Sequence, residues 1–171
     1  GDTHSASFLP NGSGYVGTFS LDPVSEAGGT GSVAWHFTVD NADIQFLAQG
    51  QTLTQDYLVT IADNNGGSTT QDITVTIDGT NDAPTAVSET VITDVGTSAT
   101  VEIPNWALAL NDTDPDTIDH LSLGGITASS GGSAVKFGDA FFTDDATLGG
   151  SFSYTTFDGT TTSSNTATAT V

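Results

Sequence analysis

The sequence has no arginine and no cysteine, and Lys136 is its single basic residue apart from three histidines. Against this one lysine stand 21 aspartates and glutamates, which set the formal net charge at −20 at pH 7. A chain this acidic repels the phosphates of nucleic acids and anionic lipid headgroups, so neither is expected as a direct partner. The lack of cysteine excludes disulfide bonds, thiolate zinc sites and thiol catalysis.

Methionine and long apolar runs are absent as well. No stretch approaches the roughly 20 apolar residues of a membrane-spanning helix and no signal peptide is present, so we expect no membrane insertion. Because the chain starts at Gly1 and lacks methionine, we expect it to be a piece of a longer protein.

Catalytic constellations are also missing. Serines are frequent, but neither a Gly-x-Ser-x-Gly elbow nor a Ser-His-Asp set stands out, so we do not expect an enzyme. The histidines, His4, His36 and His120, lack the spacing of a metal-ligand set. We expect them to be solvated or locally hydrogen-bonded.

Glycine, serine and threonine are plentiful, and short runs of β-branched residues alternate with polar ones, which is the composition of an all-β protein. Residues 57–77 and 154–171 repeat one pattern: a strand, a turn led by aspartate and a second strand, which indicates a hairpin. Two copies predict two domains of one β-sandwich architecture.

A segment with glycine and proline at residues 78–84 separates the two copies. Pro84 forces extended backbone on the residue before it, and the segment is too short to act as a flexible tether. The predicted parts are a first domain at residues 1–79, a linker at 80–84 and a second domain at 85–171. The second domain opens with a strand at 86–92 that the first lacks, so we expect the first domain to be truncated at its N-terminus.

Alternation also predicts which residues face the cores. In the first domain the expected inward set is Val33, Trp35, Phe37 and Val39. A short helical turn at 41–49 is expected to carry Ile44, Phe46 and Leu47 inward, and a second turn is expected at 104–110. The further strands expected in the second domain lie near 119–127, 134–138, 140–143 and 150–156.

The acidic residues are clustered. Asp112, Asp114 and Asp116 alternate along one loop, and every second residue of a curled loop can point at one ion. An EF-hand is excluded, because Thr117 and Leu123 stand where it needs glycine and glutamate. Like charges this close repel and no base is at hand to neutralise them, so we favour bound Ca²⁺ over a solvated Asp-rich turn.

Asp63 and Asp158 each stand at the head of a hairpin turn. Ordinary turn chemistry explains them, and so does ligation of an ion at the end of a sandwich, so both interpretations stay open. The bond between Asp114 and Pro115 is chemically weak, which keeps a calcium-induced self-cleaving module as a further alternative to a simple loop stiffener.

Several segments of the first half resemble the VCBS repeat of very large bacterial surface and secreted proteins. They read Gly-Gln-Thr-Leu-Thr-Gln-Asp-Tyr at 50–57, Ile-Ala-Asp-Asn-Asn-Gly-Gly at 61–67 and Ile-Asp-Gly-Thr-Asn-Asp-Ala-Pro at 77–84, with further likeness at 2–8 and 32–40. The second half, with Asn111-Asp-Thr-Asp-Pro-Asp116 and Phe157-Asp-Gly159, resembles the bacterial cadherin-like domain that commonly neighbours such repeats.

The resemblance implies immunoglobulin- or cadherin-like β-sandwiches in tandem, in exported proteins related to repeats-in-toxin adhesins. It implies an extracellular or cell-surface location, neighbouring repeat domains of the same chain as partners, and Ca²⁺ at domain junctions, including the linker at 80–84. Carried over by position, the ligands would be Asn81, Asp82, Glu89, Asp112, Asp114 and Asp158. We expect a monomer.

We therefore expect a calcium-stabilised segment of a bacterial adhesin that stiffens an extended stalk for cell or matrix adhesion, as in a biofilm. The alternative is a calcium-dependent lectin that binds extracellular polysaccharide with the help of exposed aromatic rings. Tyr15 and the Phe141-Phe142 pair are the candidates for exposed rings, whereas Trp35 and Trp106 are expected in the core.

Overall fold

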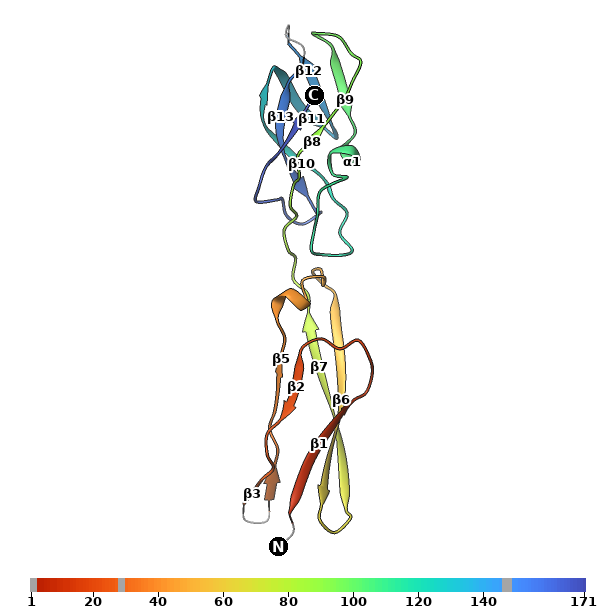
Figure 1. Ribbon diagram of the computed structural model, residues 1–171, viewed down its shortest axis with the longest axis vertical. Coiled ribbons are helices and arrows are strands. Elements are labelled where there is room, and N and C mark those ends of the chain that lie inside the picture. Colours follow the sequence, from red (N-terminus) through yellow and green to blue (C-terminus); the bar gives the residue numbers. More distant parts are fainter. Residues whose placement is uncertain (1–2, 28–29, 146–148) are drawn as a thin grey trace. The chain divides into compact units, whose positions relative to one another are not determined.

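The structure is a computed structural model that describes residues 3–27, 30–145 and 149–171. Its contacts divide the chain into two compact units, Gly1–Thr80 and Asn81–Val171. Both units are built almost wholly from strands (Figure 1). Each has its own hydrophobic core.

The first unit is a set of antiparallel strands. It contains β1 (His4–Pro10), β2 (Thr18–Leu21), β3 (Ser25–Ala27), β4 (Thr30–Ser32), β5 (Trp35–Thr38), the 3₁₀ helix η1 (Asn41–Asp43), β6 (Thr52–Asp63) and β7 (Ser68–Asp78). Strands β1, β6 and β7 form one sheet in that order, while β2 pairs with β5 and β3 with β4. The hairpin predicted at residues 57–77 is confirmed as β6–β7.

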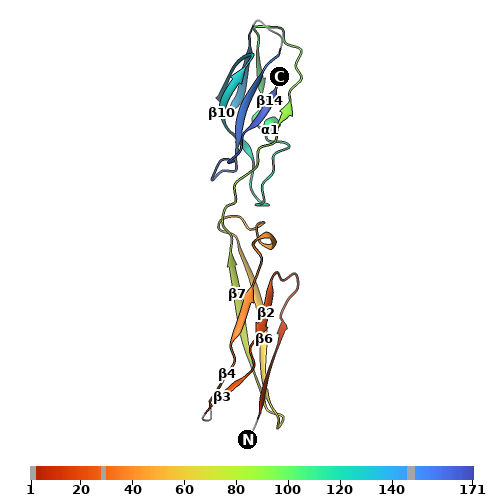
Figure 2. The same cartoon turned by 60° about the vertical axis from the view of Figure 1, so that its left-hand side comes forward.

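One face of the β1-β6-β7 sheet packs against the β2–β5 ribbon (Figure 2). Alternation along β6 buries Tyr57 and Val59, and alternation along β7 buries Val75. Phe19 of β2 closes this core, and its ring stacks on that of Tyr57 with centroids 4.1 Å apart. The opposite positions of β7 are serine, threonine and aspartate, which leaves the other face of that strand polar.

The inward set predicted for the first domain is confirmed only in part. Phe37 packs against the core. Trp35 is 44% exposed, although its ring stacks on Phe19 at 5.6 Å. Leu47 is buried as predicted, but the inward placement of Phe46 is wrong, because that side chain is 40% exposed. The helical turn ends at Asp43, so residues 46 and 47 lie beyond it and a helical pattern does not decide which of them is buried.

The second unit has two sheets. It contains β8 (Glu89–Thr90), β9 (Thr100–Ile103), α1 (Asn105–Leu108), β10 (Ser122–Ser130), β11 (Gly132–Phe137), β12 (Asp139–Asp144), β13 (Ser151–Phe157) and β14 (Ala167–Thr170). One sheet has the order β10-β13-β14-β8 and the other β11-β12-β9. The hairpin predicted at 154–171 is confirmed as β13–β14, and the predicted all-β fold is confirmed with it.

Side chains from both sheets share one core. Phe152 and Tyr154 of β13 and Phe142 of β12 are at most 1% exposed, and they are joined by Ile103 of β9 and Leu108 of α1. The alternating burial of β13 follows directly from its period-2 sequence pattern. This core holds together the end of the unit where the acidic loop begins.

Three predictions for the second unit need correction. Phe142 is buried, not exposed, and Trp106 is 68% exposed, not in the core. The helical turn at 104–110 is confirmed as α1, but it buries Leu108, and a residue two positions earlier points roughly to the opposite side of a helix. Of the strand predicted at 86–92, only Glu89–Thr90 pairs, in parallel with β14.

The single lysine has a structural role. Lys136 of β11 donates from Nζ to the carbonyl oxygens of Leu123, at 2.6 Å, and Gly124, at 2.9 Å. The pairing of β10 with β13 shifts register between Leu123 and Gly125, so these carbonyls lie at a bulge. The lysine therefore ties β11 of one sheet to the bulge of β10 in the other.

Candidate metal centre

Two parts of the second unit bring carboxylates together. Asp114 and Asp119 come from the loop between α1 and β10, and Asp158 comes from the turn after β13. One carboxylate oxygen from each lies within 4.8 Å of the others. The loop is fixed to the start of the unit by a bridge between Thr85 and Thr113. Residues more than forty positions apart thus meet at one point.

Asp158 is held as an acceptor on both of its oxygens. Its Oδ1 accepts the N–H groups of Thr160 and Thr161, each at 2.6 Å, and its Oδ2 accepts from Asn81 Nδ2 at 3.1 Å. Burial alone would raise the pKa of Asp158, but the hydrogen bonds from Thr161, Asn81 and Thr160 outweigh it and hold the pKa below its usual range. Asp158 is therefore fully charged at neutral pH.

In the neighbouring acids the charged form is disfavoured. Burial, together with the charges of Asp116, Asp119 and Asp158, raises the pKa of Asp114. Burial and the charges of Asp116 and Asp158 likewise raise the pKa of Asp119. Anions held this close need a positive charge between them, and within the described residues the only lysine is engaged at the β10 bulge.

Two carboxylate oxygens in this loop lack partners. Asp116 is only 2% exposed; its Oδ2 accepts the N–H of Asp82 at 2.8 Å, but its Oδ1 is buried without a hydrogen bond. Asp114 accepts the N–H of Asp116 on Oδ1 at 2.9 Å, and its Oδ2 is also buried and unpaired. Buried unpaired carboxylate oxygens are costly and call for an explanation such as a bound ion.

The donor set fits a hard cation. It consists of carboxylate oxygens only, which suit Ca²⁺ or Mg²⁺ and not the softer metals that thiolates and imidazoles bind. Of the residues predicted from the sequence, Asp114 and Asp158 belong to the group and Asp116 has its free oxygen nearby in the loop. Asn81 and Asp82 contact the same carboxylates through N–H donors. Asp119 was missed, although it is the next acid after Asp116 in the same run.

Asp112 and Glu89 lie in a different network. Asp112 accepts the N–H of Val87 at 2.7 Å and the hydroxyl of the buried Thr156. Glu89 lies 2.6 Å from the hydroxyl of Tyr154, which also lies 2.8 Å from the Val87 carbonyl oxygen. The group of three close carboxylates in the described residues does not include either acid. Both tie the edge of the sandwich to its core.

Glu89 gives the fold a pH dependence. Burial, and to a smaller extent the charge of Asp112, raises the pKa of Glu89. The hydrogen bond from Tyr154 lowers it, and the net result is a pKa of about 7. Between the ordinary pKa of 4.5 and about 7, the native state keeps a proton that the unfolded state releases. Glu89 therefore favours folding at low pH, and this contribution is lost as the pH rises through that window.

We expect Glu89→Gln to remove this part of the pH dependence. The amide keeps the shape of the protonated acid, so the two proteins should unfold alike at pH 4. At pH 8 the variant should be more stable by about 1–2 kcal/mol, less than the full shift because Glu89 is partly solvated. Denaturant unfolding across this pH range checks the prediction, and parallel curves for the two proteins would contradict it.

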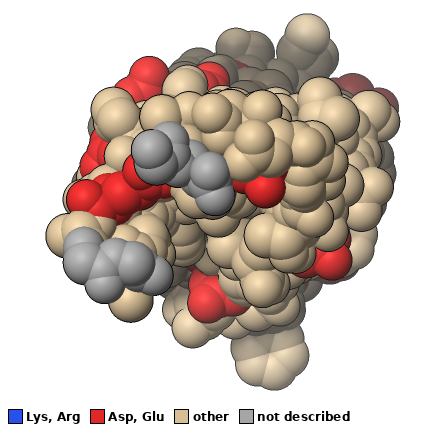
Figure 3. Space-filling model, turned by 90° about the horizontal axis from the view of Figure 1, so that it is seen from below, with Lys and Arg blue, Asp and Glu red and all other residues tan. Residues whose placement is uncertain are grey.

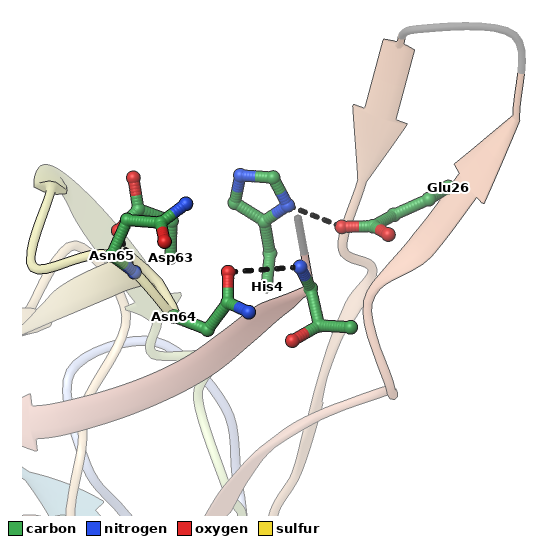
Figure 4. A network of polar contacts seen from close by, with 6 residues as sticks. His4, Glu26, Asp63, Asn64 and Asn65 are labelled. Atoms are coloured by element: carbon green, nitrogen blue, oxygen red, sulfur yellow. Dashed lines mark hydrogen bonds and ion pairs between the residues drawn. The ribbon is translucent and has the colours of Figure 1, made fainter. Parts of the chain in front are cut away.

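Asp63 lies in the first unit, at the β6–β7 turn (Figure 4). Its Oδ1 accepts the N–H groups of Asn65, at 2.8 Å, and Gly67, at 2.7 Å, and these bonds lower its pKa. Nearby, His4 pairs with Glu26 and the Thr3 N–H donates to Asn64 Oδ1 at 3.3 Å. The turn bonds are those of an ordinary hairpin.

The aromatic rings expected to be exposed for stacking on sugars are half-buried or buried. Tyr15 is half-buried and exchanges hydrogen bonds with the backbone of Asp56, at 2.8 and 3.0 Å. Phe141 is half-buried and Phe142 is in the core. The most exposed aromatic side chains are Trp106, 68% exposed, and Phe137, 87% exposed. The sequence analysis expected Trp106 in the core and did not single out Phe137.

Exposed acidic side chains occur in both units. Figure 3 shows carboxylates and no lysine or arginine on the face that it presents. Within the described residues, no helix is long and apolar enough to span a membrane.

No curated protein matches the sequence. Among solved structures, an endo-fucoidan hydrolase of glycoside hydrolase family 107 is similar at 14% identity and a TM-score of 0.31, over 99% of this chain. The chain spans only 26% of the length of that structure. Residues 81–171, more than half of the chain, match the bacterial Ig domain family. The chain therefore belongs to the bacterial Ig domain family.

Proposed function

We propose that the second unit binds Ca²⁺ at Asp114, Asp119 and Asp158, and that the ion stabilises this chain as one module of an extracellular bacterial adhesin. The observation that carries the proposal is the meeting of three carboxylates beside two buried oxygens, Asp114 Oδ2 and Asp116 Oδ1, that have no hydrogen-bond partner. Bacterial Ig domains typically lie outside the cell, where calcium is abundant.

Calcium is favoured over magnesium by the kind of site. The ligands come from a loop and a separate turn, and Ca²⁺ accepts six to eight oxygens in flexible geometry. Mg²⁺ demands near-ideal octahedral geometry and gives up its waters reluctantly. Burial first, and then repulsion between the carboxylates, raises the pKa values of Asp114 and Asp119, and an ion with two positive charges would offset that repulsion.

One ligand and its neighbour in the loop hold the residues at which the second unit begins. Asn81 donates to Asp158 and the Asp82 N–H donates to Asp116. An ion bound to Asp158 would therefore also help to order residue 81. This supports a role in stiffening a chain of repeats, with the neighbouring repeat domains of the parent protein as partners and adhesion as the outcome.

A titration followed by nuclear magnetic resonance tests the proposal. Calcium added to the ¹⁵N-labelled chain should shift the amides of residues 112–119, 158–161 and 81–82 in a saturable way, since these residues carry or contact the ligands. Magnesium at the same concentration should shift them far less. Residues 63–67 provide an internal comparison. Small, unsaturated shifts spread over all acidic segments would mean that the acids form only a diffuse counter-ion layer.

A calcium-dependent lectin is the second function we propose to test, because Trp106 and Phe137 expose their rings. A protein of charge −20 binds an acidic glycan only if an ion intervenes, so binding should be lost in EDTA. A glycan array probed with calcium and with EDTA distinguishes the two functions. Glycan binding that vanishes in EDTA would support the lectin, and no binding in either condition would leave the structural module.

A further inference from the structure

The second unit has an apolar groove of about 490 Å³ that the calcium site does not use. Its walls include Val91, Ile92, Ala107 and Leu110, and its charged lining residues are Glu89 and Glu102. Ile92 is 93% exposed and Leu110 is 77% exposed. A groove of this size, apolar with a few polar groups, is the usual form of a binding site.

The groove lies between two free strand edges. β8 is the last strand of the β10-β13-β14-β8 sheet, and β9 is the last strand of the β11-β12-β9 sheet. Glu89 and Thr90 of β8 and residues 101–103 of β9 all line the groove. A strand at a sheet edge presents unpaired backbone N–H and C=O groups, which an extended peptide can pair with.

The charge of the groove points to the chemistry of its occupant. Both charged groups that line it are carboxylates, and Glu89 Oε1 is buried without a hydrogen-bond partner. The chain has a single lysine, and Lys136 is already bound to the carbonyls at the β10 bulge. A second copy of this chain would add a net charge of −20. A basic side chain of a different polypeptide would supply the complementary charge.

We propose that this groove docks an extended segment of a partner protein, in which a lysine flanked by apolar residues places its ammonium against Glu89. The backbone of the segment pairs with the free edge of β9, the longer of the two edge strands. The aliphatic stem of the lysine and the flanking residues cover Ile92 and Leu110. Lysine suits such a groove because its stem packs on apolar surface while its head remains charged.

The probe is the peptide acetyl-Ser-Val-Lys-Val-Ser-amide, titrated into the ¹⁵N-labelled full chain at 150 mM salt and pH 8, above the raised pKa of Glu89 of about 7. The matched control peptide has norleucine in place of lysine, which keeps the stem and removes the charge. We expect saturable shifts at residues 89–92, 101–103 and 107–110 with the lysine peptide, and at least tenfold weaker binding of the norleucine peptide. Hydrogen exchange at the amides of β9 should slow in the complex.

Three variants locate the binding. Glu89→Gln should weaken binding of the lysine peptide at least tenfold and leave binding of the norleucine peptide unchanged. Leu110→Ser, at an exposed position that cannot unfold the core, should weaken both peptides several-fold. Asp94→Asn, an exposed acid outside the groove, should change neither. Equal binding of the two peptides, undiminished binding by Glu89→Gln, or shifts scattered over all acidic segments would overturn the proposal.

Other occupants would show themselves in the same experiment. Tighter binding of free 1,5-diaminopentane than of the peptide would overturn the assignment to a protein side chain. Shifts at the same residues on concentrating the chain alone would overturn the exclusion of a second copy.

Discussion

Saturating calcium should raise the melting temperature of the wild-type chain, and Asp119→Asn should remove most of that rise. The unfolded chain cannot present Asp114, Asp119 and Asp158 to one ion, so calcium bound at the proposed site would stabilise the native state over the unfolded one. At 100 times the dissociation constant the gain is about 2.7 kcal/mol per site. Calorimetry with calcium and with EDTA measures both effects.

The sign of the Asp119→Asn effect should reverse when calcium is removed. In EDTA the variant should be as stable as wild type or more so, because burial and the charges of Asp116 and Asp158 already disfavour the anion at position 119. Asp94→Asn removes an exposed acid of the same unit and should leave the calcium response intact. If both variants lose the response equally, net charge and not a specific site governs stability.

Phe142→Ala should lower the free energy of unfolding of the second unit by about 3–5 kcal/mol. The side chain is 1% exposed and lies at the centre of the core shared by both sheets, so its loss leaves a cavity. The effect should appear as a large drop in the denaturant midpoint of that unit, with little change for the first unit.

Phe137→Ala is the matched control, because it removes the same side chain five positions earlier. At 87% exposed, Phe137 buries little surface, and the change should stay within about 0.5 kcal/mol. A large loss at Phe137 together with a small one at Phe142 would contradict the register of β11 and β12.

The phenylalanines of β12 also show how much of the fold the sequence can predict. Hairpins β6–β7 and β13–β14 were predictable because a period-2 pattern and an Asp-led turn are local signals. No such local signal distinguishes the adjacent Phe141 and Phe142, because alternation requires one of the two side chains to face the core but does not determine which one. The pairing of β12 with β9 and β11 decides it, and that pairing joins distant segments.

The candidate metal site, like the fold, could be predicted from the sequence only in part. Acid spacing and the repeated hairpin aspartate singled out Asp114 and Asp158, which the fold brings together. Spacing treats Asp112 like its neighbours, yet its carboxylate accepts from Val87 and Thr156. Asp119 joins the group because the loop turns back between residues 116 and 119, where the Asp119 N–H bonds the Asp116 carbonyl. A pattern in which every second residue is an aspartate does not predict that turn.

Isothermal titration of calcium into the metal-free chain tests the central claim most directly. We expect saturable binding in the wild type, unchanged binding in Asp63→Asn because that residue belongs to the first unit, and loss of this binding in Asp119→Asn. Calcium binding that is absent from the wild type, or that Asp119→Asn retains in full, would contradict a calcium site formed by Asp114, Asp119 and Asp158.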